Sequence, residues 1–131
     1  SLKANKNPNR IYPWGDEFKT GYANTSESGI NTTSALGCFN GGESPYGVLE
    51  LSGNVWEWTR SNFEKYPYKA KDGREKLEAS PDVVRVLRGG SYFYEGRYAR
   101  CAYRGWPDPD LRSDYVGFRV VVSPFFDNSD L

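Results

Sequence analysis

The densest chemistry in this sequence lies in residues 47–59, Gly-Val-Leu-Glu-Leu-Ser-Gly-Asn-Val-Trp-Glu-Trp-Thr. Two carboxylates, Glu50 and Glu57, flank a Gly-Asn pair, and two tryptophans surround the second carboxylate. Calcium binds about six to eight oxygens from carboxylates and carbonyls, and a glycine-containing turn can direct several of them to one point. The residues alone allow a metal-binding turn. They also allow a structural loop in which Glu57 hydrogen-bonds buried backbone and the tryptophans pack in the core.

A second candidate segment is residues 92–115, where aromatic residues alternate with arginine, aspartate, serine and glycine. Rigid rings supply contact area at low entropic cost, and small polar groups adapt their hydrogen bonds to a ligand. The alternative is that half of these rings pack in the hydrophobic core, Tyr92 and Tyr103 among them. The candidate ligand-binding residues are Tyr92, Phe93, Tyr94, Tyr98, Trp106, Asp108, Leu111, Ser113, Asp114 and Tyr115.

Composition excludes several classes of function. The chain has 131 residues, the size of one domain, with 16% aromatic residues, 14 glycines and 8 prolines. Lysine plus arginine equals aspartate plus glutamate at 17 each, so we expect no nucleic-acid partner. No run of about 18 apolar residues predicts a membrane span. The absence of histidine excludes a Ser-His-Asp triad or a histidine-bound iron or zinc site built from this chain alone.

The two cysteines, Cys38 and Cys101, lie far apart in the sequence. A disulfide is one option, but the sequence favours two buried free thiols.

The elements that must position these residues are short. We expect a polar connector at 1–10 and an aromatic turn at 11–16. Residues 21–42 are predicted to form a long Gly/Asn/Ser/Thr loop, which needs an ordering contact such as a bound metal. Residues 66–81 are predicted to form a charged, solvated loop. Strands are predicted at 83–88, ended by Gly89-Gly90, at 98–104 and at 116–122, with a tail at 124–131.

Three motif groups carry a resemblance to a known family. They are Tyr12-Pro13-Trp14-Gly15, then Tyr46-Gly47-Val48 through Gly53-Asn54-Val55-Trp56-Glu57-Trp58, then Val86-Leu87-Arg88-Gly89-Gly90-Ser91 with Ala102-Tyr103-Arg104 and Gly117-Phe118-Arg119. In order and spacing, residues 11–123 resemble the formylglycine-generating enzyme (sulfatase-modifying factor) family. The resemblance implies an α+β, C-type-lectin-like fold that is rich in loops, with short antiparallel strands. It also implies that the family domain has a further N-terminal portion, supplied by the same or another chain.

The resemblance implies calcium as a cofactor at two places. The first set is Glu50 and Glu57 through their side chains and Gly53 and Val55 through their carbonyls, with Glu50 replacing a neutral ligand. The second set is Asn24, Thr25, Ser28 and Ile30, where Ser28 replaces a carboxylate and Glu27 lies adjacent.

The resemblance also locates the oxidase chemistry. The family's enzymes bind copper(I) through two cysteines that follow the Gly-Gly-Ser motif, and soft thiolates are the ligands copper(I) prefers. The first of these positions falls on Tyr94, and no cysteine occupies residues 95–100, where the second would fall. We therefore expect no copper site. A sister branch of sulfoxide synthases uses histidine-bound iron, which this chain cannot provide by itself.

Segment 92–115 also resembles the variable region of proteins diversified by diversity-generating retroelements, which use this fold as a scaffold. Mutation of the adenines in an asparagine codon can produce codons for Tyr, Phe, Ser, Asp, Gly and Leu, all of which occur in this segment. It cannot produce codons for the residues at two other positions, Trp106 and Glu95. The sequence predicts a non-catalytic, calcium-stabilised domain that binds a protein or peptide ligand in the bacterial cytoplasm or at the cell surface. The alternative is a formylglycine-generating-type oxidase that modifies cysteine in a polypeptide, with Cys101 or Cys38 as a thiol ligand.

Overall fold

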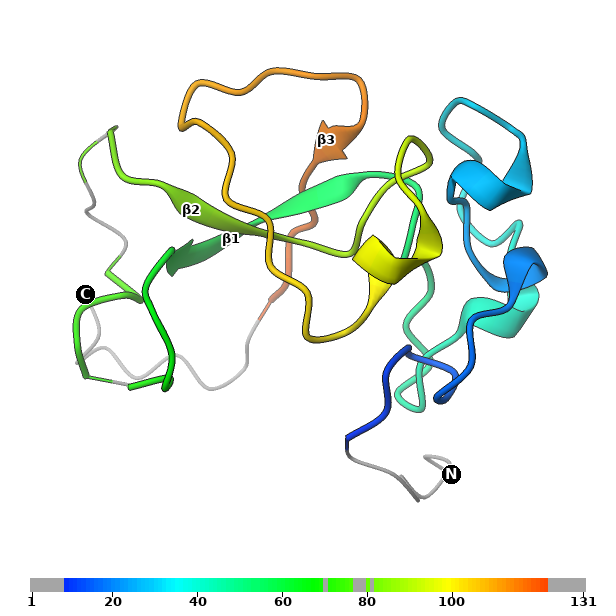
Figure 1. Cartoon of the computed structure of the whole chain (residues 1–131), viewed down its shortest axis with the longest axis horizontal. Coiled ribbons are helices and arrows are strands. Elements are labelled where there is room, and N and C mark those ends of the chain that lie inside the picture. The colour runs from blue at the N-terminus through cyan, green and yellow to red at the C-terminus, as the bar shows by residue number, and fades with distance from the viewer. Residues whose placement is uncertain (1–8, 70, 77–79, 81, 123–131) are drawn as a thin grey trace.

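The computed structural model describes residues 9–69, 71–76, 80 and 82–122. Most of the predicted 1–10 connector and all of the 124–131 tail lie outside the described residues. The elements in chain order are the 3-10 turns η1 (Thr20–Tyr22), η2 (Ser26–Ser28) and η3 (Asn40–Gly42), strands β1 (Trp56–Asn62) and β2 (Arg85–Arg88), the 3-10 turn η4 (Gly96–Ala99) and strand β3 (Val116–Gly117). Figure 1 shows the sheet on one side and the turns η1 to η3 gathered on the other. None of the described residues forms a helix that is long and apolar enough to cross a membrane.

The sheet has the order β2-β1-β3, so β1 is its central strand. β1 pairs antiparallel with β2, with Trp58 opposite Leu87, and parallel with β3, with Trp56 opposite Val116. An irregularity in the β1–β2 register falls between Trp58 and Asn62. The aromatic and β-branched residues of β1 and β2 suit a half-buried pleated surface, which explains why these segments are strands.

The core is small and mixed. Its buried apolar members are Tyr12, Ala23, Trp56, Val86, Leu87, Tyr92 and Ala99. Trp58 is only half-buried, so of the two tryptophans in the 47–59 segment only Trp56 belongs to the core. Side chains that are wholly buried include Asn24, Thr25 and Ser91, which shows that polar contacts share the interior with rings.

Aromatic stacking and hydrogen bonds order the N-terminal third. The rings of Tyr12 and Trp14 stack at 5.3 Å between centroids, and Phe18 packs against Tyr12. The predicted aromatic turn is therefore present. The Asn24 side chain donates to the carbonyl of Thr32 (2.9 Å) and to the hydroxyl of Ser34 (3.2 Å), which ties the loop to itself.

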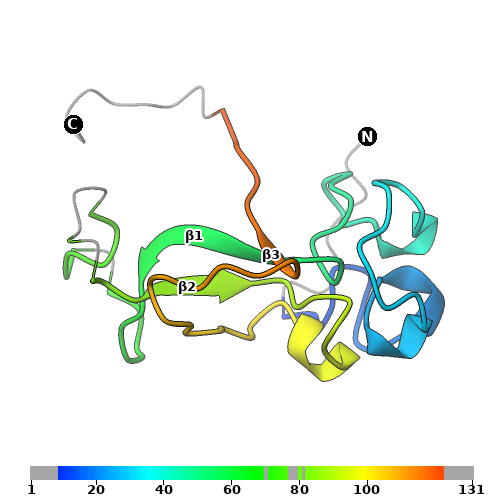
Figure 2. The same ribbon diagram turned by 90° about the horizontal axis from the view of Figure 1, so that it is seen from above.

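Two predicted strands differ in the structure. Residues 98–104 form no strand: the segment begins in η4 and continues as turns, and Gly105 alone makes a β-bridge, to Leu87. The predicted strand at 116–122 pairs only at Val116 and Gly117. Beyond Gly117 the chain leaves the sheet, as Figure 2 shows. Apolar β-branched composition favours an extended backbone, but a strand also requires a neighbour to pair with.

Candidate functional site

The turn at residues 50–57 has a left-handed backbone at three positions. The φ angles of Glu50, Gly53 and Asn54 are 56°, 80° and 66°. A Cβ at Gly53 would lie 2.4 Å from the carbonyl oxygen of Asn24, so only glycine fits there. The amide of Gly53 donates to the Gly89 carbonyl (2.8 Å) and that of Asn54 to the Asn24 carbonyl (2.7 Å). The turn is therefore fixed by loops from both earlier and later in the chain.

Arg119 binds this turn from the C-terminal side. Its guanidinium meets the carboxylate of Glu57, with Nε at 2.7 and 2.8 Å from the two oxygens. It also donates to the carbonyls of Leu49 (3.2 Å) and Glu50 (2.7 Å). Hydrogen bonding to Glu57 raises the pKa of Arg119 above its ordinary value. One cation thus joins a carboxylate and two carbonyls contributed by segments about 60 to 70 positions away in the sequence.

Glu50 is buried, and its carboxylate accepts a hydrogen bond from the Gly37 amide at 3.2 Å. Burial raises the pKa of Glu50, and the Gly37 amide and the charge of Arg119 offset part of that rise. Ionisation of Glu50 is thus less favourable here than in water, and the charge of Arg119 already compensates part of that cost.

The donors of the predicted calcium set Glu50, Gly53, Val55 and Glu57 are all hard oxygens, which calcium prefers, but both carboxylate oxygens of Glu57 already accept hydrogen bonds from Arg119. Among the described residues no cluster of three acidic, cysteine or histidine side chains can hold a metal ion, so such a site would rest on two carboxylates plus carbonyls and water. A buried carboxylate whose charge is only partly compensated is the feature of this turn that suits a cation.

The second predicted set is brought together in part. The Ser28 hydroxyl donates to the Asn24 side-chain oxygen (2.9 Å), and the Ile30 amide donates to the Ser28 oxygen (3.3 Å). The neighbouring carboxylate of Glu27 is directed elsewhere and accepts from the Gly96 amide at 2.8 Å. Burial would raise the pKa of Glu27, but hydrogen bonds to its carboxylate, among them that of the Gly96 amide, outweigh burial and lower that pKa. This set supplies no carboxylate and fits calcium less well than the first.

An aromatic cluster forms the largest part of the predicted ligand surface. Tyr94 contacts Trp56, Phe93, Tyr98 and Tyr115 with centroid distances of 5.5 to 5.9 Å, and Phe93 stacks on Tyr115 at 5.5 Å and 12°. Phe93 is 63% exposed, whereas Trp56 below it is buried. Burial and a hydrogen bond with Tyr115 raise the pKa of the Tyr94 phenol. We call Phe93, Tyr94, Tyr98 and Tyr115 the aromatic face.

The remaining predicted ligand residues have different places. Tyr92 is buried and does not belong to the exposed surface; burial and a hydrogen bond to Asp114 raise its pKa. The Leu111 amide closes a turn on the Asp108 carbonyl (3.0 Å), and the Ser113 hydroxyl donates to Asp114 (3.3 Å).

Trp106 belongs to another cluster. Its ring packs on Phe63 at 5.5 Å, and the Arg104 guanidinium also lies over Phe63, at 4.6 Å. Tyr103 instead contacts Trp56 and Tyr98. Successive side chains of an extended segment point to opposite sides, which separates residue 103 from residues 104 and 106. The predicted single surface is therefore two surfaces.

The cysteines are free, as the sequence favoured, but both are exposed, so the prediction that they are buried is wrong. The Cys101 amide donates to the Ile11 carbonyl at 2.7 Å, which fixes this residue at the surface beside the N-terminal turn. Partial burial raises the pKa of the Cys101 thiol, so it has little thiolate character.

The sequence singled out neither Arg119 nor Arg104 as a site residue. The only available signal was that Arg119 ends a family motif, Gly117-Phe118-Arg119.

The chain belongs to the sulfatase-modifying factor family: the model of the sulfatase-modifying factor enzyme 1-like domain matches residues 4–124. It is 31% identical to a formylglycine-generating enzyme of Mycobacterium tuberculosis, covering 86% of this chain and 45% of that protein. It is 33% identical to a hercynine oxygenase of the same organism (86% and 27%) and 30% identical to an inactive C-alpha-formylglycine-generating enzyme 2 of Bos taurus (86% and 37%). This chain thus spans less than half the length of each of these relatives.

Two solved structures are similar in fold. PvdO from Pseudomonas aeruginosa matches with a TM-score of 0.64 and 26% identity, covering 82% of this chain and 42% of that one. Treponema denticola variable protein 1 matches with a TM-score of 0.61 and 22% identity (82% and 39%). These matches confirm the expected α+β, loop-rich, C-type-lectin-like fold class.

Proposed function

We propose that this chain is a non-catalytic domain that binds a protein or peptide ligand through the aromatic face. The observation that carries the proposal is the packing of Phe93 and Tyr115 into an exposed stack that rests on Tyr94 and buried Trp56. Aromatic side chains held in place by their neighbours supply contact area without losing rotamer freedom on binding.

Tyr94 also supports a non-catalytic role. It occupies the position where the resemblance places the first copper-binding cysteine, and its ring contacts four other rings of the cluster. A phenol whose pKa is raised is a poor ligand for copper(I), which prefers thiolates. The relatives include proteins named as enzymes and others named as inactive, so family membership alone does not decide activity.

Calcium is part of the proposal as a stabiliser of the scaffold. Glu50 and Glu57 with the carbonyls of Gly53 and Val55 would hold it, and its charge would compensate the buried Glu50 carboxylate. A ligand that binds only the folded state raises the melting temperature, so calcium would stabilise the folded domain while sharing the Glu57 carboxylate with Arg119.

The test is a selection of binders from a phage-displayed peptide library, followed by titration of one selected peptide against variants. Phe93→Ala and Tyr98→Ala should each weaken that peptide by about tenfold or more, which corresponds to about 1.4 kcal/mol. Tyr46→Ala is the matched control, since Tyr46 is equally exposed but lies in the loop after η3. Binding that Phe93→Ala and Tyr98→Ala both leave unchanged would remove the assignment of this face.

The alternative function is oxidation of a cysteine in a polypeptide, favoured by the relatives named as formylglycine-generating enzymes. It requires thiol ligands, and Cys38 and Cys101 are free. Aldehyde formation in a cysteine-containing peptide that is lost in Cys101→Ser would establish it and overturn the non-catalytic proposal.

A further inference from the structure

The far end of the sheet carries a stack of rings around one arginine. The Arg104 guanidinium lies between Phe63 (4.6 Å) and Tyr66 (4.1 Å), and its Nη1 donates to the Glu64 carbonyl at 2.8 Å. Trp106 packs on the same Phe63 ring. Tyr66 is 62% exposed and Trp106 63%, so the stack presents two rings to solvent. We call Phe63, Tyr66, Arg104 and Trp106 the Arg104 stack.

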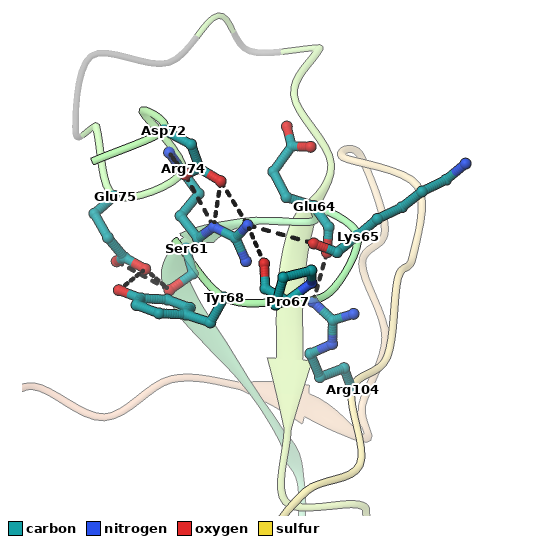
Figure 3. A network of polar contacts seen from close by, with 9 residues as sticks. All are labelled: Ser61, Glu64, Lys65, Pro67, Tyr68, Asp72, Arg74, Glu75 and Arg104. Carbon is teal, nitrogen blue, oxygen red and sulfur yellow. Dashed lines mark hydrogen bonds and ion pairs between the residues drawn. The ribbon is translucent and has the colours of Figure 1, made fainter. Parts of the chain in front are cut away.

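A buried polar network holds the loop beside this stack. Arg74 is only 4% exposed and binds Asp72 and the carbonyls of Lys65 and Pro67, with its guanidinium 4.8 Å from the Tyr68 ring centre. Figure 3 shows these groups converging on the Arg74 guanidinium. The Arg74 side chain thus fixes the loop that presents Tyr66.

A second set of contacts ties the loop to β1. Glu75 accepts from the Ser61 hydroxyl (2.8 Å) and from the Tyr68 hydroxyl (3.3 Å), and the Asn62 amide donates to the Arg74 carbonyl (2.7 Å). The predicted solvated excursion is therefore ordered around a buried guanidinium in its described part. Such pre-organisation lowers the entropic cost of binding.

The charges left at the surface of this loop are mainly positive. Asp72 is paired with Arg74, which lowers its pKa to about 2, and Glu75 is paired with Arg60. Among the described residues none forms an ion pair with the exposed ammonium groups of Lys65, Lys69, Lys71 and Lys76. Figure 3 shows the Lys65 side chain extending away from the network. Lys65 directly precedes Tyr66, so one unpaired cation adjoins the Arg104 stack in the chain and the other three lysines follow in the same loop. Glu64, which is also exposed, is the one carboxylate of residues 64–76 that no described residue pairs with.

We propose that the Arg104 stack and the lysines of residues 65–76 form a second docking surface, which takes an extended acidic segment of a protein partner. Carboxylates of the segment would meet the lysines, and its apolar side chains would lie on Tyr66 and Trp106. Tryptophan, tyrosine and arginine are the residues that dominate binding at protein interfaces. A polypeptide fits better than nucleic acid because the chain as a whole has no net charge to attract a polyanion. The inference is independent of the aromatic face, which Tyr103 and Trp56 place on the other side of the 103–106 segment.

The experiment uses fluorescein-labelled peptides of about twelve residues and fluorescence anisotropy. The probe is a Glu-Pro repeat, because proline rings pack on exposed tyrosine and tryptophan and keep the peptide extended. A Gln-Pro repeat is the uncharged control. Single-stranded oligothymidine of similar length is titrated in the same way, to compare a nucleic-acid ligand with the acidic peptide. The Glu-Pro peptide should bind at least about tenfold more tightly than the Gln-Pro peptide, and its affinity should fall with added salt.

Two variants assign the binding to this surface. Lys65→Glu/Lys69→Glu and Trp106→Ala should each reduce binding of the Glu-Pro peptide by about tenfold or more. Lys19→Glu/Arg112→Glu makes the same change in net charge elsewhere and should leave binding within about twofold, as should Phe93→Ala. Thermal melts of every variant establish that it is folded.

Three outcomes would overturn the proposal. The first is equal binding of the Glu-Pro and Gln-Pro peptides. The second is an equal loss of binding in the two charge-reversal variants. The third is tighter binding of oligothymidine than of the acidic peptide, which would assign the surface to single-stranded nucleic acid.

Discussion

The turn at residues 50–57 and the aromatic face achieve rigidity by different means. The turn is held by backbone amides and by Arg119, and it contains three residues with positive φ. The aromatic face is held by ring contacts at 5.5 to 5.9 Å above Trp56, and its outermost ring, Phe93, is mostly exposed. A backbone-determined turn tolerates few substitutions, whereas the exterior of a ring cluster can change while its base stays. This difference is what a scaffold with a variable binding surface requires.

The largest expected effect is that of Gly53→Ala in the turn. The added Cβ would meet the Asn24 carbonyl at 2.4 Å in a left-handed conformation, so we expect a loss of about 3 kcal/mol or more, or no folded protein. Gly29→Ala is the matched control: its φ is 70° with no atom within 4 Å of the added Cβ, and it should cost about 1 to 2 kcal/mol. Urea denaturation measures both. Equal effects of the two substitutions would show that the turn is not sterically fixed.

Trp56→Ala tests the base of the aromatic face against its exterior. Removal of this buried ring should cost about 3 to 5 kcal/mol, because it leaves a cavity under Tyr94 and Tyr103. Phe93→Ala should cost less than about 1 kcal/mol, since most of that ring is exposed. Comparable losses in urea denaturation would contradict the division between base and exterior.

Arg119→Lys should cost about 1 to 3 kcal/mol. Lysine keeps the charge but cannot bind the Glu57 carboxylate and two carbonyls in one plane. Arg112→Lys, at an exposed position in the 105–115 loop, is the control and should change the melting temperature by less than about 1 °C. If the Arg119 variant has the same melting temperature as the wild type, the guanidinium does not fix the turn.

The smallest expected effect is that of Glu50→Gln, and its sign depends on calcium. Burial raises the pKa of Glu50, so its favourable contribution is present below the unfolded pKa and is lost as the pH rises through the folded pKa. In chelator at pH 7 the ionised carboxylate is a cost, and the Gln variant should melt a few degrees above the wild type. With calcium the wild type should gain more than the variant. A Gln variant that melts lower in chelator would show that the carboxylate is already compensated without an ion.

Several features of the fold could be predicted from the residues. Glycines between apolar segments indicated turns, and Gly89 and Gly90 have φ of 92° and 74°. Strand β2 lies inside the predicted 83–88 strand because β-branched residues favour an extended backbone. The segments 98–104 and 116–122 were also predicted as strands, and there the prediction was wrong at most positions. Pairing depends on which neighbour is available, and composition does not encode it.

The candidate site, too, could be predicted from the sequence only in part. The sequence indicated that Tyr94, Phe93 and Tyr115 are surface aromatics of one region, and the structure joins them. It placed Trp106 with them, yet the alternation of residues 103–106 sends that ring to Phe63 instead. Exposure of Cys38 and Cys101 was also missed, since burial depends on packing at a distance in the sequence.

What the sequence determined by itself is the family and its fold class, because ordered motifs with fixed spacing carry both. It also excluded a histidine-dependent triad or a histidine-bound metal site built from this chain alone. The tertiary structure alone decided that one arginine from the end of the chain, Arg119, closes the 50–57 turn, and that the rings after Ser91 form two surfaces. Contacts across about 40 to 70 positions depend on how loops fold back, and no local pattern specifies that.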